Sequence, residues 1–368
     1  MILLSLSFIP FAHAADYDIQ EYPLSGPSAP RGITTGVDGN IWFTEYAGNN
    51  ISKITSDGVI TRYPVPTSGS GPRTITQGSD GNMWFTEYIG GKIGRITPSG
   101  VITEFTIPTS TPGANAIIKG SDGNVWFMET AAEKIGKITP SGVITEYPLN
   151  SPACGVVAIT AGPDGNIWIG CTAGARVIKM TTAGIMTDYT PVNMSSIAGI
   201  SPGSDGNIWM TETQDDAVSK ITPTGTYTRY TTPVGSSNIG GTLGSDGNFW
   251  YFDNGRDRLV SVTPSGTFSE YTTPTPNGLT LTLTGEPYGD LWFVQYSAGQ
   301  IGRLFLPAVA MPVTPPSTIP AVTTPPLQAP NTGFERQSRS NIVIAVTTLA
   351  ATTLILGFVT IHRRSDTL

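Results

Sequence analysis

Hydrophobic residues occur in short runs separated by turn residues, and the same unit recurs every 41 or 42 positions. The tryptophans mark this repeat: Trp42, Trp84, Trp126, Trp168, Trp209, Trp250 and Trp292. Each unit holds four runs rich in β-branched and aromatic residues, with Asp-Gly-Asn as a typical turn before the tryptophan. Short runs joined by tight turns predict four antiparallel strands per unit, which we name A to D.

Four antiparallel strands per unit of this length are typical of a β-propeller blade. We therefore predict an all-β fold with one seven-bladed β-propeller over residues 15–306. The seventh unit stops near Phe305 without a D strand, and a matching segment, Ile19–Leu24, precedes the first unit. This N-terminal strand is predicted to close the last blade, which removes an open sheet edge.

Composition supports this fold class and excludes others. The chain has 43 Gly and 30 Pro in 368 residues, and these are the poorest helix formers. Its 7 Trp, 13 Tyr and 13 Phe are too many for a disordered chain. A net charge of −7 argues against nucleic acid as a partner. We expect a monomer.

Both ends of the chain have the composition of targeting segments. Residues 1–14 are apolar and end in Ala-His-Ala, which predicts a signal peptide. Residues 307–333 are rich in proline and predict an extended stalk. Residues 342–361 are uncharged and long enough for one transmembrane helix, and the basic tail 362–368 predicts a cytoplasmic end. The propeller is then expected outside the cell, anchored at its surface.

The segment before this span resembles the Leu-Pro-x-Thr-Gly cell-wall sorting signal. It contains Pro330, Thr332 and Gly333, with Ala329 where that signal has Leu. The resemblance implies a sortase and the cell wall as partners, with cleavage between Thr332 and Gly333. A plain membrane anchor is the alternative.

The repeat units resemble the streptogramin lyase (virginiamycin B lyase) family. The motifs that carry this resemblance are Gly-x-Asp-Gly-Asn-Ile-Trp-Phe-Thr-Glu at Gly36–Glu45 and Lys-Ile-Gly-Arg-Ile-Thr at Lys92–Thr97. The resemblance covers about residues 17–306. It implies a seven-bladed propeller that opens a cyclic depsipeptide lactone by elimination, a carbon–oxygen lyase reaction that uses a histidine base and magnesium.

The family's functional histidines lie at the start of strand A, eleven residues before the tryptophan. This chain has Arg31, Arg73 and Asn115 at that position in the first three units. Its two histidines are His13 and His362, outside the propeller units. Arginine stays protonated and cannot replace a general base, so the sequence leaves catalysis undecided.

A second candidate set lies at the end of strand B, three residues after the tryptophan. Five of these residues are acidic: Glu45, Glu87, Glu129, Glu212 and Asp253. Strand order predicts that they share one channel mouth with Arg31, Arg73 and Asn115 as a ligand-binding site. Glu45, Glu87 and Glu129 could hold Mg2+ or Ca2+, which prefer oxygen ligands. The alternative is that Glu45 and Glu87 pair with Arg31 and Arg73.

Other recurring residues have structural interpretations. The tryptophans are expected in the core, and the Asp-Gly-Asn triplets in hairpin turns. Basic residues eleven positions after the tryptophan, such as Arg95, are expected to pair with D-strand acids such as Glu104. Cys154 and Cys171 are predicted to form a disulfide at the channel-mouth face of the fourth unit, because export would place them in an oxidising compartment.

Two functions remain open. One is a surface-anchored binding or interaction module whose channel mouth takes an extracellular glycan, peptide or small molecule. The other is a metal-assisted carbon–oxygen lyase, or a hydrolase, with a rebuilt active site.

Overall fold

The computed structural model describes residues 12–13, 18–149, 154–214, 216–233, 235–285 and 289–306. The chain divides into two units, Met1–Met311 and Pro312–Leu368, and every described residue belongs to the first. Most of the predicted signal peptide, and all of the stalk, sorting motif, span and tail, lie outside the described residues. Among the residues described, no helix is both long and apolar enough to cross a membrane.

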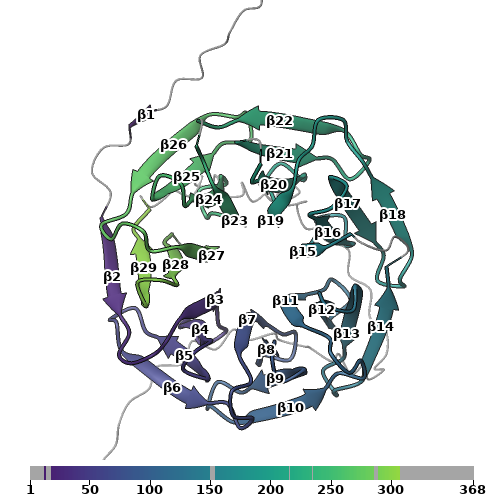
Figure 1. The fold of residues 1–368 in the computed structure, drawn as a ribbon. Coiled ribbons are helices and arrows are strands. Elements are labelled where there is room, and N and C mark those ends of the chain that lie inside the picture. The colour runs from purple at the N-terminus through teal and green to yellow at the C-terminus, as the bar shows by residue number, and fades with distance from the viewer. Residues whose placement is uncertain are drawn as a thin grey trace, which may run out of the picture. The chain divides into compact units, whose positions relative to one another are not determined.

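The described strands form seven sheets arranged in a ring, as Figure 1 shows. The first three blades consist of β3 (Pro30–Thr35), β4 (Ile41–Glu45), β5 (Asn50–Ile54) and β6 (Ile60–Pro64); β7 (Pro72–Gln77), β8 (Met83–Glu87), β9 (Lys92–Ile96) and β10 (Ile102–Thr106); and β11 (Ala114–Lys119), β12 (Val125–Glu129), β13 (Lys134–Ile138) and β14 (Ile144–Pro148). The next three consist of β15 (Val156–Ala161), β16 (Ile167–Cys171), β17 (Arg176–Met180) and β18 (Met186–Tyr189); β19 (Ile197–Pro202), β20 (Ile208–Glu212), β21 (Ala217–Ile221) and β22 (Tyr227–Thr231); and β23 (Asn238–Leu243), β24 (Phe249–Asp253), β25 (Arg258–Val262) and β26 (Phe268–Thr272). The seventh contains β27 (Thr280–Gly285), β28 (Leu291–Gln295) and β29 (Gln300–Leu304).

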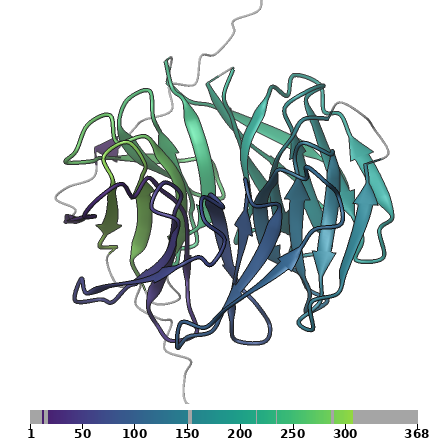
Figure 2. The same cartoon turned by 60° about the horizontal axis from the view of Figure 1, so that its bottom comes forward.

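The N-terminal strand closes the ring, as the sequence predicted. β2 (Ile19–Pro23) pairs antiparallel with β29 and completes the seventh blade, with Glu21 opposite Gly302. The two-residue β1 (Ala12–His13) pairs parallel with β26 at the edge of the sixth blade, which the sequence did not indicate. The tilted view in Figure 2 shows the blades side by side around the central axis.

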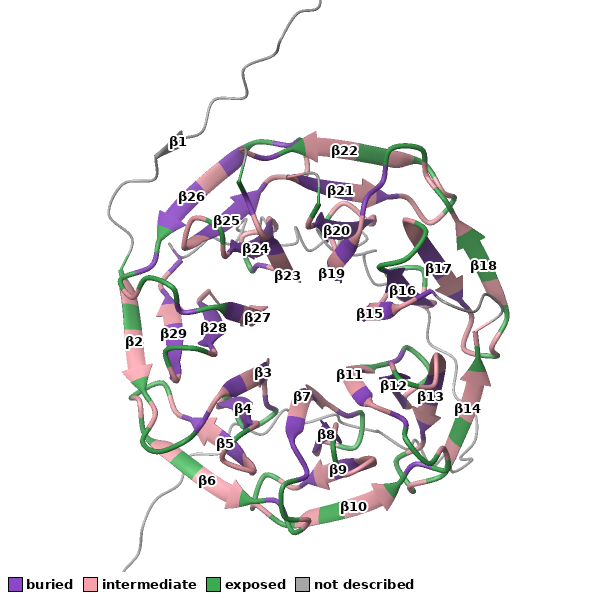
Figure 3. Cartoon of the chain, in the orientation of Figure 1, coloured by how far each residue is buried: buried purple, intermediate pink, exposed green. Residues whose placement is uncertain are grey.

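Burial follows the radial order of the strands. Every residue of the B strands is buried, whereas the outer D strands alternate between partly buried and exposed positions in most blades (Figure 3). All seven tryptophans are at most 1% exposed, so they lie in the core as predicted. Each contacts an aromatic ring of the D strand of its own blade, and six of these pairs are stacked, such as Tyr63 on Trp42 with ring centroids 5.8 Å apart.

The Asp-Gly-Asn turn fixes the tryptophan next to it. In the first six blades the turn aspartate accepts a hydrogen bond from the indole nitrogen, as Asp122 does from Trp126 at 3.1 Å. The same carboxylate accepts two further bonds from Asn124. Although burial alone would raise it, hydrogen bonds from Asn124 and Trp126 lower the pKa of Asp122. The turn aspartate therefore links its hairpin to the buried tryptophan.

Basic residues eleven positions after the tryptophan connect neighbouring blades. Arg95 donates to the carbonyl of Pro140 in the next blade at 2.9 Å, and its guanidinium lies 5.5 Å from the Trp84 ring. The predicted pairing of Arg95 with Glu104 is wrong, because Arg95 lies opposite Thr103 and Glu104 lies opposite Gly94. Adjacent strand residues point to opposite sheet faces, so these two side chains are separated by the blade.

We predict that Asp122→Ala lowers the free energy of unfolding by about 1–3 kcal/mol, because it leaves a buried indole N–H without its acceptor. Chemical denaturation of the full chain measures the change. Asp57→Ala, at an exposed turn position, is the control and should leave stability within about 0.5 kcal/mol. Equal effects of the two substitutions would contradict the role given to the turn aspartate.

We also predict that removing residues 1–24 causes the protein to associate, because β29 then presents an unpaired edge. Light scattering coupled to size-exclusion chromatography measures the mass. A variant lacking only residues 1–17 retains β2 and should stay monomeric. A monomeric protein without β2 would show that ring closure does not need this strand.

Candidate functional site

The site begins with a local irregularity that all seven inner strands share. Each A strand shifts register against its B strand near its start, as between Pro30 and Ile33 in β3. Such bulges re-aim side chains and occur often beside functional sites. In every blade, the residue eleven positions before the tryptophan, or a residue next to it, lines a central cavity.

A cavity of about 290 Å³ lies among these bulges. Its walls come from the inner strands alone: Arg31, Arg73, Thr74, Asn115, Ala116, Val157, Ala158, Ile159, Ala198, Gly199, Ile200, Gly240, Gly241, Leu281, Thr282 and Leu283. The structure thus places Arg31, Arg73 and Asn115 together at the channel, where the sequence expected them. Arg31 and Arg73 are the charged members of this wall.

Threonine hydroxyls connect consecutive bulges and fix this part of the wall. Thr44 Oγ1 accepts from the Gly32 amide at 2.9 Å and donates to the Arg73 carbonyl at 2.9 Å. Thr86 Oγ1 repeats the pattern one blade on, accepting from the Thr74 amide and donating to the Asn115 carbonyl. The backbone next to each arginine is therefore held by a threonine of its own blade, and the Arg73 carbonyl also by Thr44 of the preceding blade.

Tyrosines fix the arginine side chains. The guanidinium of Arg31 lies between the rings of Tyr46 and Tyr296, 4.7 Å and 4.9 Å from their centroids. Arg73 lies 4.6 Å from the Tyr88 ring. Burial, and then the positive charge of Arg31, lower the pKa of Arg73. Sequence reasoning missed these tyrosines, although the position four residues after the tryptophan is Tyr only in these three units, which adjoin in the ring.

The B-strand acids lie elsewhere, which corrects the predicted acidic ring. Glu45, Glu87, Glu129, Glu212 and Asp253 are at most 1% exposed and absent from the cavity wall. Their contacts lie within or beside their own blades: Glu45 accepts from Arg62 of the D strand at 2.7 Å and from Ser52 of the C strand. The predicted pairs of Glu45 and Glu87 with the channel arginines do not form.

The reason is a charge pattern within each blade. Where the D strand has arginine, as at Arg62 and Arg229, it pairs with the B-strand acid, Glu45 or Glu212. Asp253 instead pairs with Arg256 of the following loop at 2.7 Å. Each of these three acids thus has a cation in its own blade and none from the channel.

Blades two and three have an acid in place of the D-strand arginine. Glu104 pairs with Lys92 at 2.8 Å, and Glu146 pairs with Lys134 at 3.3 Å. Glu87 and Glu129 are then left without an ion pair or a hydrogen bond of normal geometry among the described residues. Burial, and then the negative charge of Glu104, raise the pKa of Glu87 to about 7; burial, and then Glu146, raise that of Glu129 to about 7.

These positions bear directly on the proposed metal. Glu45, Glu87 and Glu129 point into three separate blades instead of meeting at the mouth. Among the described residues, no group of three or more His, Cys, Asp or Glu side chains is arranged to hold a metal ion. The predicted Mg2+ or Ca2+ site on these glutamates therefore does not fit the structure.

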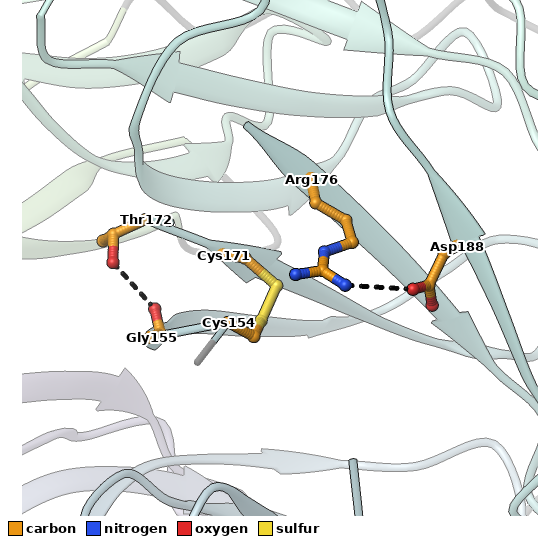
Figure 4. The surroundings of a disulfide bond; sticks show 6 residues. All are labelled: Cys154, Gly155, Cys171, Thr172, Arg176 and Asp188. Atoms are coloured by element: carbon orange, nitrogen blue, oxygen red, sulfur yellow. Dashed lines mark hydrogen bonds and ion pairs between the residues drawn. A yellow bond between two sulfur atoms is a disulfide. The ribbon is translucent and has the colours of Figure 1, made fainter. Parts of the chain in front are cut away.

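In the fourth blade the acid is replaced by a disulfide. Cys154 and Cys171 are bonded, their α-carbons are 5.2 Å apart, and both are fully buried (Figure 4). The same figure shows Thr172 donating to the Gly155 carbonyl, and Arg176 paired with Asp188 at 3.2 Å. Because Cys171 leaves no B-strand acid, the disulfide replaces the ion pair that joins strands in the first and fifth blades.

Comparison with known proteins gives one consistent family. Residues 13–190 and 144–308 match the model of the virginiamycin B lyase family. A virginiamycin B lyase from Staphylococcus aureus is 42% identical over 53 residues, which cover 14% of this chain and 18% of that relative.

Solved structures extend this similarity to the whole propeller. A crystal structure of virginiamycin B lyase from Staphylococcus aureus aligns with a TM-score of 0.75 and 30% identity, covering 79% of this chain and 100% of that one. A histidine-to-alanine variant of that lyase, described as catalytically inactive and solved with quinupristin, aligns equally well, with a TM-score of 0.75.

We predict that Glu87→Gln stabilises the protein at pH 8 and leaves it unchanged at pH 5. The carboxyl titrates near 4.5 in the unfolded chain and near 7 in the folded protein, so the folded state binds more protons between these values. Stability therefore falls as pH rises through this window, and glutamine removes that loss. A gain of about 1–3 kcal/mol at pH 8 is expected from thermal or denaturant unfolding.

Glu45→Gln is the matched control, because it occupies the same position in the first blade but leaves Arg62 unpaired. It should destabilise the protein at pH 8. A Glu87→Gln protein less stable than the parent at pH 8 would show that Glu87 has a cationic partner in solution.

Proposed function

The chain belongs to the virginiamycin B lyase family, and from this premise we propose that it is a non-catalytic binding module anchored at the cell surface. The observation that carries the proposal is the composition of the channel wall. It contains arginine, asparagine, threonine and apolar residues, and none of these accepts a proton near neutral pH. Elimination from a lactone needs such a base.

The family comparison supports the same conclusion. One relative is described as catalytically inactive after a single histidine-to-alanine change. This chain has histidine only at positions 13 and 362, so the repeat units lack that side chain entirely. The buried Glu87 and Glu129 have pKa values suited to a base, but they do not line the cavity.

What the cavity retains suits binding. Its volume of about 290 Å³ is near the lower end for small-molecule sites. Its arginine side chains are held by ring contacts and its threonine side chains by backbone carbonyls before any ligand arrives, which lowers the entropic cost of binding. We propose that an extracellular ligand enters at this mouth.

The proposed surface location is based on the sequence at the two ends of the chain. The apolar start, the proline-rich stretch, the sorting-type motif with Thr332 and Gly333, and the uncharged stretch 342–361 occur in the order expected of an exported, wall-anchored protein. The alternative function, a metal-assisted carbon–oxygen lyase or hydrolase with a rebuilt site, draws on family membership alone.

We predict that the full chain with Mg2+ does not open the lactone ring of quinupristin. Chromatography with mass spectrometry separates the outcomes, because elimination leaves the mass unchanged and hydrolysis adds one water. The Staphylococcus aureus lyase serves as the positive control. Ring opening of either kind would overturn the non-catalytic proposal.

Anchoring has its own test. Thr332→Ala is expected to move the protein from the cell-wall fraction to the membrane fraction, while surface labelling of intact cells stays positive. Asn331→Ala, one position earlier, is the matched control and should leave the distribution unchanged. A parent protein that surface labelling cannot reach would overturn the proposed location.

A further inference from the structure

We propose that the channel cavity binds a carboxylate attached to a small apolar group, with Arg31 and Arg73 holding the carboxylate. The inference rests on the proposed binding function and names the ligand class of the same site. Both charges on the cavity wall are positive and lie in adjacent blades. Neither forms an ion pair with any acid in the described part of the chain.

The surrounding acids cannot reach these two cations. The backbones of Glu45 and Glu87 lie opposite Pro30 and Pro72, the residues that precede the two arginines. Their side chains point into the blades instead, where Glu45 is paired with Arg62. Two neighbouring guanidinium groups without an internal anion favour an external one, because each disfavours the other's charge.

Contacts with tyrosine rings limit how the two arginines can bind a ligand. The Arg31 guanidinium carbon lies over the rings of both Tyr46 and Tyr296, and that of Arg73 lies over the Tyr88 ring. All N–H donors of a guanidinium lie in its plane, in a fixed fork. The Nε of Arg31 is buried without an acceptor. A planar carboxylate matches a fork of in-plane donors, so it is the anion that this arrangement fits best.

The uncharged part of the cavity wall explains the apolar group. Blades four, five and seven contribute Val157, Ile159, Ala198, Ile200 and Leu283, which carry neither charge nor hydrogen-bonding side chains. An inorganic anion would leave this surface in contact with water. A ligand with an apolar group next to its carboxylate buries it, and each buried methylene contributes about 0.8 kcal/mol. The two walls together therefore select an amphipathic monoanion.

Calorimetric titration of the purified full chain with three probes tests this inference. Benzoate has the charge and the apolar group, benzamide is its neutral analogue, and inorganic phosphate is an anion without an apolar group. We expect benzoate to bind at least tenfold more tightly than either of the others, and more weakly as salt concentration rises. Benzamide binding as tightly as benzoate, phosphate binding more tightly, or no benzoate binding at all would overturn the inference.

Variants locate the binding. Arg73→Gln and Arg31→Gln should each weaken benzoate binding at least tenfold, and Arg73→Lys should retain part of the affinity but lose the planar fork. Arg176→Gln, which removes a cation outside the cavity, is the matched control and should bind benzoate as the parent does. Circular dichroism melting of each variant confirms that it is folded. Equal losses in Arg73→Gln and Arg176→Gln would overturn the assignment.

The two proposals fail separately. Ring opening of quinupristin would reject the non-catalytic function whether or not benzoate binds. Tight binding of benzamide that Val157→Asp abolishes would leave the binding function intact and reject only the anionic ligand class.

Discussion

The fold depends on one constraint: no blade can bury both of its faces by itself. Each tryptophan is buried because the next blade covers it, and in the first six blades the turn aspartate accepts a hydrogen bond from its one polar atom. Each blade needs the next one to cover its face, so all seven blades are covered only when the ring closes. β2 is the element that closes it, because it supplies the strand missing from the last blade.

Closure also decides where chemistry can take place. Seven inner strands surround one axis, and all of them contribute residues to the cavity wall. Single substitutions in the inner strands can therefore change the cavity wall while the surrounding fold stays the same. Arg31 and Arg73 thus set the chemistry of the channel while the propeller of the family is kept.

The sequence predicted the fold well because the repeat shows both strand period and turns in every unit. It also placed Arg31, Arg73 and Asn115 at the channel, since strand order alone determines which loops share a face. It failed for Glu45 and Glu87, because the strand pattern does not show that these side chains are buried within their blades and away from the cavity wall. Arg62 of the outer strand pairs with Glu45 on the side away from the channel, and no pattern around Glu45 alone indicates this. The tyrosines that stack on the arginines were missed because they deviate from the repeat.

The way the chain leaves the propeller has a mechanical consequence. β29 is the last strand before Leu306, and it is an inner member of its blade, hydrogen-bonded to β2 on one side and β28 on the other. A force applied at Leu306 along β29 loads both ladders in shear, so their hydrogen bonds resist together and not one after another. A strand at the edge of the sheet would peel away bond by bond under the same pull. The chain order that closes the ring therefore also makes its exit strand resistant to tension.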